Sequence, residues 1–259
     1  MLAQKPSVFM IGSYNKKVLK VGVIGSRKPT AYGLRFTTEL ATELASRGII
    51  TVSGFARGID SAAHKASLER QGQTIAILGC GIDIVYPPEN KPLFSLIKKA
   101  GAIISEFKPG MPPLPQNFPR RNRLISIMSD LLIVVEAGDR SGTLITVDFS
   151  LEQGKEVMVL PGSIYSKQSI GTNRLIKQGA EPITSVDDVL EKLGMDRKTI
   201  NNGVNNHPLL QYFCDKALSL DELSNLCNTG IDQLALEVSK LQIEGYLNED
   251  LSGRFYRIR

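Results

Sequence analysis

The sequence is poor in cysteine and has no long apolar run, and both shortages narrow the class of protein. Its three cysteines, Cys80, Cys214 and Cys227, are odd in number and form no CxxC pair. This argues against a disulfide framework and against a zinc site. No stretch of about 18 apolar residues could cross a membrane, and the apolar patch near the N-terminus is too short for a signal peptide. We therefore expect a cytoplasmic protein.

Most short motifs that carry catalysis are also missing. There is no GxxxxGK[ST] phosphate loop, no HExxH, no GxSxG, and the first glycine-rich turn does not fit GxGxxG. The two histidines, His64 and His207, lie far apart in the chain, and no Asp or Glu cluster is spaced for Mg²⁺. We therefore expect that the chain is not an enzyme and needs neither a metal nor a cofactor.

The charge is unevenly spread along the 259 residues. The whole chain carries +5, but residues 203–259 carry −3 and residues 1–202 carry +8. A basic body favours a polyanionic partner, although a modest excess is often only a solvated surface. The acidic tail argues against a second grip on nucleic acid there.

Short apolar runs alternate with longer amphipathic runs through the first three quarters of the chain. The short runs are apolar at successive positions, which is typical of strands covered on both faces. They occupy residues 20–25, 49–54, 74–79, 102–106, 131–138 and 156–162. Helix-length runs occupy residues 32–48, 59–72, 92–101, 120–129, 143–154 and 187–194. This alternation predicts an α/β fold with a Rossmann-like, doubly wound, mostly parallel sheet over residues 1–195.

The remainder has a different pattern. Residues 196–206 are polar and rich in asparagine, and we expect a linker there. Three short helices are expected next, the second opened by a capping box from Ser219 to Glu222. Two β-like runs around a Ser-Gly turn end the chain. Three helices and a hairpin predict a small winged-helix domain over residues 207–259.

Glycine-rich turns follow five of the predicted strands: GSRKPTAYG, SGFARG, GCG, EAGDRSGT and PGS. In a parallel sheet these turns lie at one edge, the carboxyl ends of the strands, where α/β folds bind ligands. Helices that follow point free N–H groups at the same place. Arginines, which grip phosphate with a planar fork, occur at positions 27, 57, 120, 121, 123 and 140. The edge is therefore predicted to bind phosphate, with Gly54 and Gly58 letting the backbone close round an anion that Arg57 neutralises.

Several residues have two interpretations. Asp60 is expected to cap a helix or to orient Arg57 rather than to act as a catalytic acid. His64 is more often a packed or surface histidine than a ligand. Phe118 is either a base-stacking platform or a core residue. Cys80 is expected to be a small buried residue.

The quoted turns resemble a known family. Together with IAILGCGIDIVYPPEN, SEFKPGMPP, NFPRRNRLISIMSD, VLPGS and GTNRLIKQGA, they occur in the order and spacing of the DNA-processing protein A family, also called DprA or Smf. The resemblance covers about residues 6–193, and the tail looks like the winged helix of many members. It implies a non-enzymatic, single-stranded DNA-binding protein of natural transformation. Such proteins protect incoming DNA, form homodimers and load the RecA recombinase onto the strand.

The resemblance also implies which residues form the DNA pocket. They come from the first turn, the second turn, the RNR segment and the turn after the fifth strand: Gly25, Ser26, Arg27, Ser53, Gly54, Arg57, Phe118, Arg121, Asn122, Arg123, Ser141, Gly142 and Thr143.

Three features depart from the family pattern. About twenty residues precede the first core strand, so the N-terminal helical domain of many members is not expected here. The segment PPLPQ has no lysine, so we expect Arg120 to supply the positive charge that some members have there. The third tail helix has three acids and one lysine, so a protein-contact or regulatory role fits it better than major-groove reading.

A second function remains open on sequence grounds. The body resembles, more distantly, the lysine-decarboxylase-like phosphoribohydrolases, whose PGGxGTxxE stretch carries a catalytic glutamate. Here Val147 stands at that glutamate's position and Asp148 follows it, which disfavours a nucleotide hydrolase. For the dimer interface we consider the segment around Leu175 and Ile176, although both residues could equally belong to the core.

Overall fold

The structure is a computed structural model that describes residues 8–195, 207–213, 217–227, 229–243, 246–249 and 253–257. The chain divides into two compact units between Asp196 and Arg197. The linker predicted at 196–206 lies outside the described residues. Among the helices of the described part, none is both long and apolar enough to traverse a bilayer.

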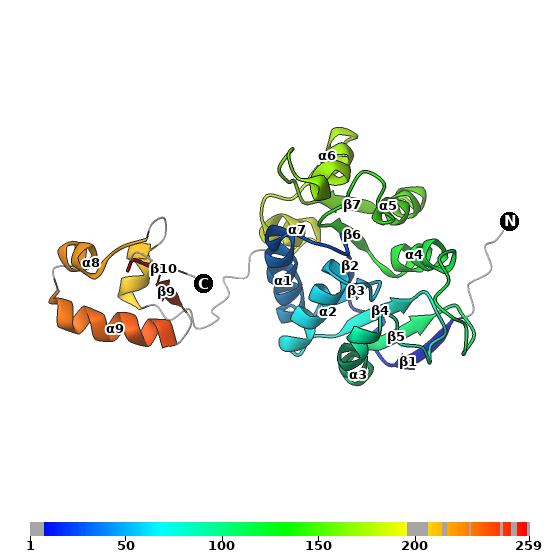
Figure 1. Cartoon of the computed structure of the whole chain (residues 1–259), viewed down its shortest axis with the longest axis horizontal. Coiled ribbons are helices and arrows are strands. Elements are labelled where there is room, and N and C mark those ends of the chain that lie inside the picture. The colour runs from blue at the N-terminus through cyan, green and yellow to red at the C-terminus, as the bar shows by residue number, and fades with distance from the viewer. Residues whose placement is uncertain are drawn as a thin grey trace. The chain divides into compact units, whose positions relative to one another are not determined.

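The first unit is built on one eight-stranded sheet (Figure 1). Its strands lie in the order β1-β5-β4-β3-β2-β6-β7-β8, and every pair is parallel except β1 with β5. Six match predicted runs, but β1 and β8 were not predicted. Their bounds are β1 Phe9–Gly12, β2 Lys20–Ile24, β3 Ile50–Ser53, β4 Thr74–Leu78, β5 Ala102–Ser105, β6 Leu131–Val134, β7 Glu156–Val159 and β8 Glu181–Pro182.

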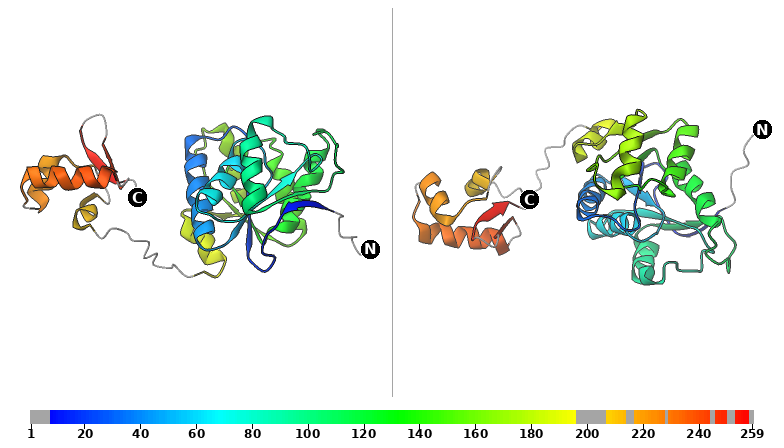
Figure 2. Two further views of the ribbon diagram at one scale, coloured as in Figure 1. Left: turned by 90° about the horizontal axis from the view of Figure 1, so that it is seen from below. Right: turned by 45° about the horizontal axis from the view of Figure 1, so that its top comes forward.

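Helices cover both faces of this sheet, as the views in Figure 2 show. The helices α1, α2, α3 and α7 pack on one face, and α4, α5 and α6 pack on the other. Every residue of β3 to β6 is buried, which explains why these runs are continuously apolar. The helices are α1 Ala31–Ser46, α2 Ile59–Glu69, α3 Lys91–Ala100, α4 Asn117–Met128, α5 Thr143–Glu152, α6 Ile170–Lys177 and α7 Val186–Lys192, with short 3₁₀ helices η1 Pro88–Asn90 and η2 Lys167–Ser169. The Rossmann-like, doubly wound prediction is confirmed.

The helix α6 was not predicted, and it decides the place of two residues. Leu175 is buried against the sheet in the same core cluster as β7, and Ile176 packs partly buried beside it. Leu175 therefore belongs to the core, and Ile176 lies partly exposed at its edge, where a role in a dimer interface stays a prediction. Most apolar side chains of the segment around Leu175 pack within this chain.

The second unit has its own core of leucines with Phe213, Val238 and Phe255. The predicted capping box is confirmed, because the Ser219 amide donates to Glu222 Oε2 (2.9 Å) and the Glu222 amide donates to Ser219 Oγ (3.2 Å). Its elements are η3 Pro208–Phe213, α8 Leu220–Cys227, α9 Ile231–Ile243, β9 Leu247–Glu249 and β10 Phe255–Arg257, the two strands being antiparallel. The winged-helix assignment stays a prediction.

Candidate functional site

A pocket of about 520 Å³ opens at the carboxyl ends of the parallel strands. It lies where the chain, having placed β3 to β5 on one side of β2, crosses to the other side with β6. Such a topological switch point is where open α/β sheets hold ligands. Nine of the thirteen predicted site residues line it: Gly25, Ser26, Arg27, Phe118, Arg121, Asn122, Ser141, Gly142 and Thr143.

Hydrogen bonds join the segments around this pocket. Asn122 Nδ2, from α4, donates to the carbonyl oxygen of Gly142 (3.1 Å). Thr143 Oγ1, at the start of α5, donates to the carbonyl oxygen of Gly25 (3.3 Å). The pocket wall is therefore made of three chain segments that hold one another in place.

Two basic residues of the first turn, Arg27 and Lys28, line the pocket with exposed side chains. The Arg27 guanidinium carbon lies 5.4 Å from the centroid of the Phe118 ring, within cation–π range. A Cβ at Gly79 would lie 2.8 Å from the same ring, so Gly79 leaves the room that Phe118 needs. Phe118 is thus a half-buried ring next to an arginine rather than a bare platform. The only aromatic that touches it within the described chain is Tyr86, at 5.9 Å between centroids.

Arg121 is buried, and its guanidinium is committed to the protein itself. One of its nitrogens donates to the carbonyl oxygens of Gly54 and of Ile77, the latter at 2.5 Å. Burial lowers the pKa of Arg121 to about 10, and the neighbouring Asp60 partly offsets this effect. At neutral pH Arg121 therefore carries a charge that pins the end of β4 to the turn after β3.

Asp60 is the buried counterpart of Arg121. Asp60 lies in the first turn of α2, and its Oδ2 accepts a hydrogen bond from the amide of Ala56, which precedes the helix (3.1 Å). Burial raises the pKa of Asp60, while Arg121 lowers it. The charge that Asp60 balances is thus that of Arg121 rather than that of Arg57. It is also the one acidic residue among those that line the described pocket.

The two glycines of SGFARG make room for other groups of this protein, and their predicted contact with an anion stays a prediction. A Cβ at Gly54 would lie 2.7 Å from Asp60 Oδ2 and 2.8 Å from the guanidinium carbon of Arg121. Gly58 has a φ of 77°, and a Cβ there would clash with the carbonyl oxygen of Ser26. Both glycines therefore admit groups of this protein, namely the buried charge pair and the first turn.

Four predicted residues lie outside the main pocket. Ser53 is buried and donates to the carbonyl oxygen of Val23 (2.6 Å). Arg123 pairs with Glu106 (2.6 Å). Gly54 and Arg57 line a smaller adjoining pocket that also includes Tyr86 and Phe118. Arg57 is exposed and pairs with Glu89.

The amino end of α1 was expected to present free N–H groups, but a carboxylate of the protein occupies it. Glu136, which follows β6, is buried and accepts from the Thr30 amide (3.1 Å) and the Thr30 hydroxyl (2.5 Å). A Cβ at Gly33 would lie 2.6 Å from the carboxyl carbon of Glu136. Glu136 was not predicted, because its only signal in the sequence is an acid directly after an apolar strand.

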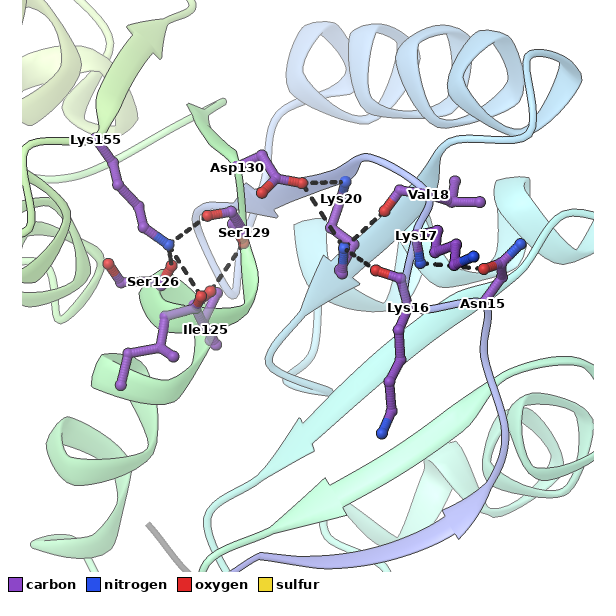
Figure 3. A network of polar contacts seen from close by, with 11 residues as sticks. Asn15, Lys16, Lys17, Val18, Lys20, Ile125, Ser126, Ser129, Asp130 and Lys155 are labelled. Atoms are coloured by element: carbon purple, nitrogen blue, oxygen red, sulfur yellow. Dashed lines mark hydrogen bonds and ion pairs between the residues drawn. The ribbon is translucent and has the colours of Figure 1, made fainter. Parts of the chain in front are cut away.

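Lys155 fixes the far end of α4, the helix that carries Phe118, Arg121 and Asn122 (Figure 3). Its ammonium donates to the carbonyl oxygens of Ser126 (2.5 Å), Ile127 (2.9 Å) and Ser129 (2.5 Å). The Ile127 carbonyl is one that a helix leaves unpaired at its C-terminus, the Ser126 carbonyl also accepts the Ser129 amide (3.1 Å), and Ser129 is the residue that ends α4. Partial burial lowers the pKa of Lys155. Close by, Asp130 accepts the Lys20 amide (2.8 Å) and so anchors the start of β2.

Two residues with open interpretations lie in the core. His64 Nδ1 is 2.7 Å from Thr74 Oγ1, which itself donates to the Thr51 carbonyl. Nδ1 therefore carries the proton, and burial lowers the pKa of His64 to about 3. Cys80 is also buried, and burial raises the pKa of its thiol to about 11.

The position that carries the glutamate in phosphoribohydrolases offers no acid to this pocket. Counted from Gly142 and Thr143, the glutamate of GTxxE falls at Thr146, a buried pocket residue without a carboxyl group, and not at Val147, which is 1% exposed and packs in the sheet core. Asp148 is exposed and is not part of the pocket wall.

A basic pocket at the switch point of a doubly wound sheet defines a class of proteins that hold phosphate-bearing ligands. Within that class, the chain belongs to the DNA recombination-mediator protein A family, which it matches over residues 2–194. The family resemblance inferred from the glycine and arginine turns is thereby confirmed.

Relatives of known sequence support this membership. Protein Smf of Escherichia coli K12 is 36% identical over 255 residues, which cover 93% of this chain and 68% of that protein. The DNA processing protein DprA of Bacillus subtilis is 41% identical over 174 residues, or 67% of this chain and 59% of that protein. The chain thus spans about three fifths to two thirds of the length of these relatives.

Two solved structures are similar to the first unit. DNA processing protein A from Streptococcus pneumoniae superposes with a TM-score of 0.68 at 41% identity, covering 71% of this chain and 65% of that one. The Helicobacter pylori protein gives a TM-score of 0.69 at 33% identity, covering 74% of this chain and 89% of that one. The latter structure is described as giving insight into a unique single-stranded DNA binding mode.

Proposed function

We propose that this chain binds single-stranded DNA in the pocket at the carboxyl ends of its strands and acts in DNA processing and recombination. The observation that carries the proposal is the pocket itself. It combines exposed Arg27 and Lys28 with Phe118, and its one acid, Asp60, is buried beside a cation. The reported DNA binding of the Helicobacter pylori relative points the same way.

The binding mechanism follows from these side chains. Arg27 and Lys28 attract backbone phosphates, and a base enters the pocket beside the Phe118 ring. For this the guanidinium of Arg27 supplies one face against which the base stacks. Ser141 and Thr143 add hydroxyls at the amino end of α5. Nothing in this mechanism breaks a covalent bond, so the proposed role is not enzymatic.

The wider role is proposed from the family. The protein would act in the cytoplasm as a homodimer, whose two pockets hold one strand by avidity. It would protect incoming DNA during natural transformation and load RecA recombinase onto it. Sedimentation with and without oligonucleotide tests the dimer. RecA filament assembly on strands precoated with a single-strand-binding protein tests the loading.

Fluorescence anisotropy of labelled oligo(dT) tests the DNA pocket. The wild type is compared with Arg27→Ala at two salt concentrations, with a duplex of equal length as competitor. Arg70→Ala is the matched control, since Arg70 is an exposed arginine just past the other end of α2. We expect Arg27→Ala alone to lose about tenfold or more in affinity and about one phosphate's share, roughly 0.7, of the log–log salt slope. Equal binding by both variants would contradict the pocket assignment.

A further inference from the structure

The most exposed large apolar side chains in the described chain lie in the turn that follows β7. Tyr165 is 91% exposed and Ile164 is 80% exposed. Leaving two such side chains in water has no folding benefit, because neither contributes buried area to the core. Neither residue belongs to the pocket wall. We therefore infer that these two side chains contact another molecule.

The turn that presents them is held in place. Asn173, on α6, accepts the Gly162 amide (3.2 Å) and donates to the Gly162 carbonyl (2.9 Å). Within the turn, the Tyr165 amide donates to Ser163 Oγ (3.2 Å). The Tyr32 hydroxyl, from α1, donates to the carbonyl oxygen of Pro161 (3.1 Å). Tyr165 thus projects from a fixed base rather than from a loose loop.

This turn lies at the same sheet edge as the pocket and contacts its rim. Gln168 Nε2 donates to the carbonyl oxygen of Lys28, a pocket residue, at 3.5 Å. The carbonyl oxygen of Lys167 lies 3.5 Å from the position of a Cβ on Gly138, in the turn that also supplies Ser141. A DNA strand that leaves the pocket past Lys28 is therefore directed toward the turn that carries Tyr165.

The charge along this route suits a phosphate backbone. Lys28, Arg140 and Lys167 are exposed, and no ion pair involves any of them within the described residues. The nearby acid Asp139 is already paired with Arg174 (2.7 Å). Aromatic rings beside a basic track are the usual composition of surfaces that bind single strands.

We propose that Tyr165, with Ile164 beside it, forms a second base-contact site, on which a nucleotide outside the pocket stacks while Lys28, Arg140 and Lys167 hold the intervening phosphates. This inference rests on the proposed function, because the ligand is the same DNA strand. It makes the footprint longer than the pocket. Its apolar part confers no base preference, since every base has a stacking face.

A fluorescence experiment tests the contact directly. The chain has no tryptophan, so Tyr165→Trp introduces a single indole. We expect its fluorescence to be quenched on saturation with oligo(dT) of about 20 nucleotides, which spans both sites, and not with one of about 4 nucleotides, which fills only the pocket. Leu151→Trp is the matched control, because Leu151 is 58% exposed at the far end of α5. An indole at position 165 that stays unquenched in the saturated complex would overturn the proposal.

Affinity measurements make the test quantitative. With the long oligonucleotide, Tyr165→Ala should bind about 5- to 100-fold more weakly, the range for losing one stacked base, and Tyr165→Phe should bind like the wild type. With the short oligonucleotide all three should be equal. A wild type that binds neither oligonucleotide contradicts the proposed function itself. Unchanged DNA affinity together with a Tyr165→Ala effect on self-association would overturn the second site and make the turn a protein-contact surface.

Discussion

The buried pair of Arg121 and Asp60 gives the sharpest stability prediction. The perturbation is Arg121→Met, which keeps an apolar stem of similar reach and removes the guanidinium. The carbonyl oxygens of Gly54 and Ile77 then lose their donor, and the Asp60 carboxylate loses its cation. Because Asp60 stays buried, water cannot replace what is lost.

The magnitude follows from these losses. Arg121 and Asp60 attract each other through their charges but make no direct ion pair. The loss therefore reaches about 3–5 kcal/mol, the range for breaking a buried ion pair, only because the carbonyls of Gly54 and Ile77 also lose their donor. We therefore expect the free energy of unfolding to fall by about 4 kcal/mol. This is a large part of the roughly 5–15 kcal/mol that stabilises a domain, and it lowers Tm by about 8–16 °C.

A second substitution, combined with the first in a double-mutant cycle, separates the effect of the Asp60 charge from the effect of packing. Adding Asp60→Asn removes the stranded carboxylate while Oδ1 can still accept the Ala56 amide. The double variant should therefore be more stable than Arg121→Met alone, by about 2 kcal/mol. Urea unfolding followed by circular dichroism measures both. If the double variant is equally or less stable than the single one, the pair is not what holds this turn.

The pH dependence has a definite sign. Burial already raises the pKa of Asp60, and removing Arg121 raises it further. A group whose folded pKa exceeds its unfolded value of about 3.9 destabilises the fold as pH rises between the two. The deficit of Arg121→Met should consequently shrink as pH falls through the folded pKa that Asp60 has in the variant. A deficit that grows as pH falls would contradict this sign.

Three further predictions concern the scaffold. In the wild type, His64 should lower the free energy of unfolding by up to about 1.4 kcal/mol per pH unit as pH falls from about 6.5 to 4, because the unfolded histidine binds a proton and the buried one, with a pKa of about 3, does not. His64→Leu should remove this slope, which unfolding at several pH values measures. Asp188 caps α7, which lowers its pKa to about 2, so Asp188→Ala should cost about 1 kcal/mol at pH 7 and progressively less below pH 4. Lys155→Met should cost about 2 kcal/mol in thermal unfolding, since the Ile127 and Ser129 carbonyls lose this donor and the Ser126 carbonyl keeps only the Ser129 amide, whereas the exposed Lys65→Met should cost almost nothing.

The sheet and its ligand edge could be predicted from sequence because both follow from local patterns. Continuous apolar runs predict buried parallel strands, and the glycines after them predict turns at one edge. The helix predicted at 120–129 starts three residues later than α4, whose first turn includes Pro119, a position where a missing N–H costs nothing. β8 has only two residues, too few for any pattern to show.

The roles of the arginines could not be predicted, because each depends on a partner distant in sequence. Arg57, Arg121 and Arg123 look alike in the chain. Arg57 pairs with Glu89, and Arg123 pairs with Glu106. Arg121 donates to buried carbonyl groups and is balanced by Asp60. Only Arg27 lines the pocket without an acidic partner among the described residues. Tertiary packing alone decides which guanidinium remains for a ligand.

The carboxylate of Glu136 at the head of α1 has a consequence for selectivity in the cell. That position is where a nucleotide cofactor normally binds its phosphates, and here a carboxylate of the protein occupies it. A free mononucleotide would meet this carboxylate at the head of α1 in place of free N–H groups. A polymer can engage several weak sites at once and does not depend on this one. Under the proposed function, this internal carboxylate disfavours the phosphates of mononucleotides at α1 and leaves a DNA strand its contacts with the pocket residues.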